Sequence, residues 1–80
     1  MQKFNYIIMF TESTGNEMYL AHSLSTSEDC AEFTAKRELA QQCESVADAA
    51  QWLAGALQRQ EIEICDNETV EFIPVLPSQQ

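Results

Sequence analysis

The segment from residue 4 to residue 10, Phe-Asn-Tyr-Ile-Ile-Met-Phe, constrains the fold more than any other part of the chain. It is rich in β-branched and aromatic residues, which favour strands. Alternate residues of a strand point to opposite faces of a sheet, and here both alternate sets are largely apolar. A strand with two apolar faces is covered on both sides, so we expect this segment to be a central strand.

A second alternating segment follows after a short turn signal. Residues 13–16, Ser-Thr-Gly-Asn, are turn formers, and residues 17–24 then alternate again. Two alternating segments joined by a short turn are typical of a β-hairpin. We therefore expect the chain to open with a hairpin.

Two helices are predicted in the middle of the chain. Residues 25–28, Ser-Thr-Ser-Glu, form a capping-box sequence, and the helix that they start would run to about Gln42. A second helix is predicted to start near Ser45. Its apolar residues follow the i, i+3, i+4, i+7 spacing of one helix face: Val46, Ala49, Ala50, Leu53 and Leu57.

The last part of the chain alternates on both sides of a polar turn. Residues 61–65 and 70–73 flank Asp66-Asn67-Glu68, which predicts a closing hairpin. Pro74 has no backbone N–H to donate to a neighbouring strand. The last strand should therefore end there or lie at a sheet edge.

The predicted element order is ββααββ, and the predicted fold class is α+β. The expected assembly is a four-stranded, mainly antiparallel sheet with two helices packed on one face. Eighty residues suffice for one domain, over residues 1–75, and residues 76–80 would be a frayed tail.

The charge balance narrows the choice of partners. Acidic residues outnumber basic ones by 13 to 4, and the formal net charge is −9. This disfavours direct nucleic-acid binding and anionic membranes, because both need Lys and Arg to meet negative groups. It favours a basic protein surface, which is often a nucleic-acid-binding groove. No base occurs between Lys3 and Lys36 or after Arg59, so two acidic stretches carry the negative field.

The predicted closing hairpin concentrates this charge. When its apolar residues share one face, Glu63 lies opposite Glu71, with Glu61 two residues away. Like charges directly opposite each other destabilise an antiparallel pair, so such a row is typical of a site for a basic partner. The alternative is a solvated face whose acids prevent edge-to-edge aggregation. The candidate partner-binding residues are these acids and their neighbours, together with those expected near the start of the first helix: Glu61, Glu63, Asp66, Glu68, Glu71, Glu28, Asp29 and Glu32.

The alternation also predicts an apolar patch on the sheet face away from the helices. A grouped patch of this kind suggests dimerisation or another protein interface. The alternatives are that one strand faces the other way or that the tail covers the patch. The candidate interface residues are Ile7, Met9, Tyr19 and Ile73, with Val75 beside them.

The chain offers little for metal binding or catalysis. Cys30, Cys43 and Cys65 are widely spaced and His22 is the only histidine, so we expect no metal or cofactor. Cys30 would lie in the first turn of a helix, where a thiol becomes more nucleophilic, and His22 precedes it. A Cys–His pair also needs an oxyanion hole and a pocket, and no Gly-rich loop lies near either residue. We therefore expect no enzymatic activity.

Free thiols and a short N-terminal apolar run predict a cytoplasmic protein. In its general character, the chain resembles small acidic phage-encoded inhibitors, such as anti-CRISPR proteins and nucleic-acid mimics. The resemblance lies in size, acidity and the lack of a catalytic site, and it includes no shared motif. It implies an inhibitor in a bacterial host that engages a basic, nucleic-acid-binding protein or nucleoprotein complex through acidic residues. The alternative is a dimerising structural or regulatory module that uses the apolar sheet face.

Overall fold

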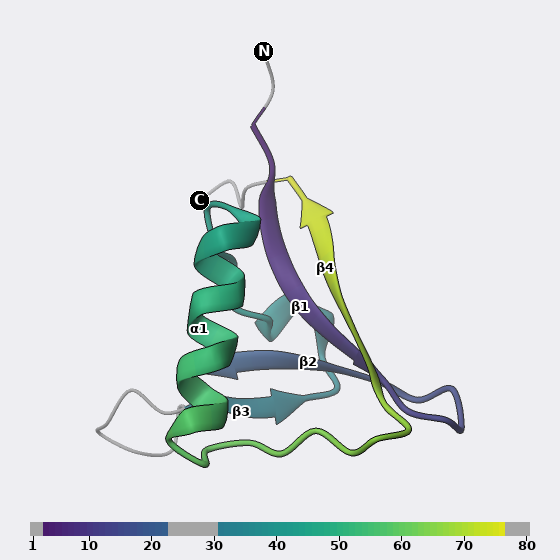
Figure 1. Cartoon of the computed structure of the whole chain (residues 1–80). Helices are drawn as coiled ribbons and strands as arrows, with labels where there is room; N and C mark the ends of the chain where they lie inside the picture. The colour runs from purple at the N-terminus through teal and green to yellow at the C-terminus, as the bar shows by residue number, and fades with distance from the viewer. Residues whose placement is uncertain (1–2, 23–30, 77–80) are drawn as a thin grey trace.

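The strand β1, Asn5–Thr11, lies at the centre of the sheet, as its two apolar faces predict. The computed structural model describes residues 3–22 and 31–76, and there β1 is paired on both sides (Figure 1). The sheet order is β3-β2-β1-β4, and all three pairings are antiparallel. The other elements of this part of the chain are β2, Glu17–His22; β3, Ala31–Thr34; the 3-10 turn η1, Arg37–Leu39; the helix α1, Val46–Gln58; and β4, Thr69–Val75.

The α+β class and the opening hairpin are confirmed, but the first predicted helix is wrong. The described residues contain one α-helix, and the order is βββαβ. Where a helix to Gln42 was expected, Ala31–Thr34 pairs with β2, and a single 3-10 turn follows. The expected helical stripe would have placed Leu39 in the core, yet this side chain is about half exposed. As a strand, the segment instead buries Ala31 and packs Phe33 edge-on against Phe10, with ring centroids 4.9 Å apart. The capping-box residues, 25–28, lie outside the described residues.

The second predicted helix is confirmed as α1. Ser45 is its N-cap, and the Ser45 hydroxyl accepts a hydrogen bond from the Asp48 N–H at 3.1 Å. Its packed face is narrower than the sequence pattern predicted. Val46 and Leu57 stay exposed, while the fully buried Ala49 and Ala56 bring the helix close to the sheet, with Trp52 and Leu53 packed beside them.

The predicted closing hairpin is also wrong. Residues 61–65 form no strand, and β4 pairs with β1 over its whole length, from Asn5 opposite Val75 to Thr11 opposite Thr69. A central strand needs a neighbour on each side, and β1 offers β4 a seven-residue ladder. The 61–65 segment serves the core in another way, because Ile62 is buried and Ile64 packs against the same cluster.

Residues 41–43 fill the gap that opens where β1 and β2 diverge. The β1–β2 pairing covers only Met9 to Thr11 of β1. Beyond it, Tyr6 exchanges two backbone hydrogen bonds with Cys43, each 2.8 Å long. The Gln41 N–H donates to the Leu20 carbonyl oxygen at 3.1 Å. These bonds satisfy backbone groups that would otherwise be left unpaired in the sheet.

Each face of the sheet carries an apolar cluster. The larger cluster lies between the sheet and α1 and contains the fully buried Ile8, Phe10 and Leu20. On the opposite face, behind the sheet in Figure 1, lies η1 with the segment that follows it. The smaller cluster on this face comprises Ile7, Met9 and Tyr19, packed by Ala40, Ile73 and Val75.

Within the described ranges, no helix is both long enough and apolar enough to cross a membrane. Of the predicted tail, only Leu76 belongs to these ranges, where it follows the end of β4 and is exposed.

Candidate acidic interface

Parts of the two acidic stretches of the sequence meet at one end of the sheet. The turn between β1 and β2 lies beside the loop before β4, at the lower right of Figure 1. The Asn67 side-chain amide donates a hydrogen bond to the Ser13 hydroxyl at 3.1 Å, joining residues 54 positions apart. Neither residues 11–17 nor residues 61–71 include a Lys or Arg.

The β1–β2 turn has a fixed backbone. The Glu12 N–H donates to the Asn16 carbonyl oxygen and the Gly15 N–H to the Glu12 carbonyl oxygen, both at 2.9 Å. Gly15 has a φ of +94°, a conformation that side chains with a Cβ rarely adopt. The turn therefore holds Glu12 and Glu17 at a defined place beside the loop.

The loop before β4 closes on itself through Glu68. The Glu68 N–H donates to the Cys65 carbonyl oxygen at 3.0 Å, and the Cys65 N–H donates to Glu68 Oε1 at 2.8 Å. The neighbouring carboxylates act on the exposed Cys65 thiol. Its pKa is raised, first by the hydrogen bond with Glu68 and the negative charge of Glu68, then by desolvation, and then by the negative charges of Glu63 and Asp66. Three carboxylates thus share one electrostatic environment.

Strand register adds Glu71 to this end and relates it to Glu17. Glu17 lies opposite Thr11, Thr11 lies opposite Thr69, and Glu71 follows two residues later on β4. Directly opposed residues share a sheet face, so Glu17 and Glu71 lie on one face, about 12 Å apart from strand spacing and rise. We call the following set the acidic end: Glu12, Glu17, Glu63, Asp66, Glu68 and Glu71.

Four of the sequence-predicted acids therefore come together: Glu63, Asp66, Glu68 and Glu71. The predicted opposition of Glu63 and Glu71 is absent, because Glu71 pairs with Met9 of β1. Glu12 and Glu17 were not among the candidates. A central β1 needs a second neighbour, and considering β4 for that role would have placed the first turn beside the last loop.

Glu61 belongs to a different environment. Its carboxylate lies 2.8 Å from Arg59 Nε, and its Oε1 accepts a hydrogen bond from the Ala31 N–H at 3.1 Å. The pKa of Glu61 is lowered, first by the hydrogen bond from Arg59 and then by that from Ala31. Glu32 lies on β3, at the opposite edge of the sheet from β4. Glu28 and Asp29 fall outside the described residues.

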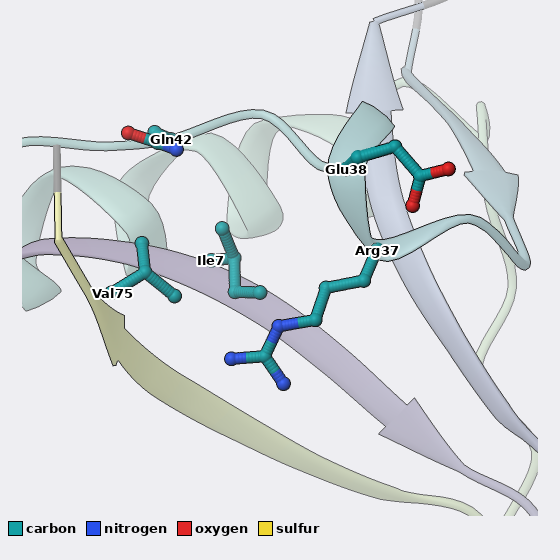
Figure 2. Close-up of a pocket in the computed structure, with 5 residues that line it drawn as sticks. All are labelled: Ile7, Arg37, Glu38, Gln42 and Val75. Carbon is teal, nitrogen blue, oxygen red and sulfur yellow. The ribbon is translucent and has the colours of Figure 1, made fainter. Parts of the chain in front are cut away.

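The apolar face is covered within the single chain. Ile7, Met9 and Tyr19 are 2%, 9% and 6% exposed, and Ile73 and Val75 pack against them. One hollow beside this cluster, of about 360 Å³, is lined by Ile7, Val75, Arg37, Glu38 and Gln42. Figure 2 shows Arg37 reaching along the sheet beside Ile7, while the Glu38 carboxylate points away from Ile7.

Of the two groups considered for catalysis, only His22 belongs to the described residues. His22 stacks on Trp52, with ring centroids 5.0 Å apart, and its Nδ1 is buried without a hydrogen-bond partner in that part of the chain. Cys30 lies outside the described residues, so the geometry of a Cys30–His22 pair stays untested. No three His, Cys, Asp or Glu side chains in the described ranges gather as metal ligands would.

Comparison with protein-family models, curated proteins and solved structures finds no significant match to this chain.

Proposed function

We propose that this chain is a non-enzymatic binding protein that engages a basic protein surface through the acidic end. The observation that carries the proposal is the convergence of two base-free acidic stretches, joined by the contact between Asn67 and Ser13. Charged groups held on a defined backbone favour association with a surface of opposite sign and speed the encounter.

The proposed partner is a nucleic-acid-binding protein or nucleoprotein complex. Such proteins carry Lys and Arg that bind phosphate groups, and a group of carboxylates on a small domain can meet the same side chains. The protein would then act as an inhibitor in the cytoplasm of a bacterial host, as small phage-encoded anti-CRISPR proteins do. Blocking of a nucleic-acid groove is the mechanism that this charge distribution supports.

The test is capture of partners from a bacterial lysate by the tagged chain, with the bound proteins identified. We expect a basic nucleic-acid-binding protein whose capture decreases between about 50 and 300 mM salt, because screening shortens the reach of exposed charges. Added DNA or RNA fragments should compete with the chain for the captured protein. Capture that is insensitive to both salt and nucleic acid would contradict the proposal.

A further inference from the structure

The hydrogen bonds of Tyr6 determine to which side each backbone N–H and C=O of β4 points. In an antiparallel strand, the N–H and C=O of one residue point to the same side, and the side alternates along the chain. The N–H and C=O of Tyr6 both bond to Cys43, so they point away from β4. The groups that bond β1 to β4 therefore belong to Asn5, Ile7, Met9 and Thr11.

The same alternation fixes which groups of β4 face outward. The β4 residues opposite those four are Val75, Ile73, Glu71 and Thr69, and their backbone groups point inward to β1. Val70 and Phe72 therefore direct their N–H and C=O groups to the outer side, and Pro74 directs its C=O there. Pro74 is tolerated within the strand because its missing N–H would face the edge.

This outer edge has no partner among the described residues. β4 is the last strand in the sheet order, and no described segment pairs with its outer side. In Figure 1 it forms the rim of the sheet, away from α1. An edge with unpaired N–H and C=O groups is a template for an added strand, and peptide-binding domains use such edges for this purpose.

The negative charge beside the edge indicates which kind of strand would bind there. Glu71 is exposed at the middle of β4, and the acidic loop that contains Asp66 and Glu68 leads into the strand. A guest residue opposite Glu71 would lie on the same face, with its Cβ about 5 Å from that of Glu71. Lys or Arg is favoured there, whereas a second copy of this chain brings a further net charge of −9.

We propose that the outer edge of β4 binds an extended basic segment of the partner as a fifth strand, bonded to Val70, Phe72 and Pro74. This inference rests on the proposed function and names the form in which the partner is recognised. Backbone bonds supply the register, and the alternating side chains beside Glu71 supply the preference for Lys or Arg.

The first test is amide hydrogen exchange of the full chain, with a capped heptapeptide of alternating Val and Lys as the probe. In the free protein, the Val70 and Phe72 amides should exchange faster than those of Glu71 and Ile73. The peptide should slow the Val70 and Phe72 amides at least about tenfold. A control peptide of equal charge, with Pro in place of the two inner Val residues, should leave them unchanged.

Two outcomes would overturn the inference. Slowing of the Val70 and Phe72 amides with rising protein concentration alone would assign the edge to a second copy of the chain. Unchanged exchange rates of the Val70 and Phe72 amides at millimolar probe peptide would mean that no strand binds to the edge. Salt-sensitive capture of a basic protein together with unchanged amides would leave the proposed function standing while this inference fails.

Matched variants give a second test. Val70→Pro removes an outward N–H and should weaken binding of the Val-Lys peptide roughly fivefold relative to Val70→Ala, which keeps it. Glu71→Lys should weaken binding roughly threefold to tenfold and should favour a Val-Glu peptide instead. The control, Glu44→Lys, is an equal charge change at an exposed position outside β4. Equal effects of Glu71→Lys and Glu44→Lys would contradict the inference, even where the Val70→Pro variant does not fold.

Discussion

The acidic end and the region around Glu61 both carry carboxylates but use them in opposite ways. The Glu61 carboxylate contacts the Arg59 guanidinium and the Ala31 N–H, and in this way it connects the end of α1 to β3. At the acidic end, the exposed carboxylates of Glu17, Asp66 and Glu71 have no base in the same segments. A carboxylate that is paired within the fold stabilises the fold, whereas one without a cation remains available to a partner.

The first prediction concerns the turn that builds the acidic end. Gly15→Ala places a Cβ on a backbone with a φ of +94°, although no neighbouring atom lies within 4 Å of it. We expect a loss of about 1–2 kcal/mol in the free energy of unfolding, due to backbone strain alone. Chemical denaturation measures this loss. Unchanged stability would contradict the positive φ of Gly15 in this turn.

The second prediction concerns Glu61. Glu61→Gln should lower the melting temperature by a few degrees at pH 7, while Asp66→Asn should leave it unchanged or slightly raised. The folded pKa of Glu61 is lowered, so its stabilisation is present above the unfolded value, 4.5, and is lost as the pH falls through the folded pKa. The melting temperatures of the wild type and Glu61→Gln should therefore converge as the pH falls below 4.5. A constant difference from pH 7 to pH 3 would contradict the assignment.

The sequence predicts some elements of this fold and not others, for a physical reason. β1, the opening hairpin and α1 follow from local periodicity, because each of their segments is long enough to define its period. Residues 31–34 are too few to separate a strand from a helical turn, and the apolar spacing that favoured a helix was satisfied there by chance. Only pairing with β2 decides between the two.

The partner of β4 could not be read from local pattern either. Residues 61–65 alternate and lie next to β4 in the sequence, which is the usual sign of a hairpin. The longer ladder with β1 prevails, and this non-local choice places Glu71 opposite Met9 instead of opposite Glu63. The structure therefore brings four of the candidate acids to one end of the sheet, but the hairpin that was expected to connect them is absent.

The third and smallest prediction uses Cys65 as a reporter of the acidic end. Glu68→Gln keeps an oxygen for the Cys65 N–H but removes the charged hydrogen-bond partner that raises the pKa of the thiol. The reaction of Cys65 with a thiol reagent near pH 8 should become severalfold faster, measured with Cys30 and Cys43 replaced by Ser. Glu61→Gln is the control and should leave the rate unchanged. Equal rates in the wild type and Glu68→Gln would contradict the shared electrostatic environment.

The most direct test of the central claim is the dissociation constant of the captured partner for two variants with equal net charge. One variant neutralises the acidic end with Glu17→Gln, Asp66→Asn and Glu71→Gln. The other neutralises three exposed acids elsewhere, with Glu38→Gln, Glu44→Gln and Asp48→Asn. We predict that the first variant binds roughly tenfold more weakly and that the second stays within about twofold of the wild type. Equal weakening of both would mean that general acidity, and no particular surface, attracts the partner.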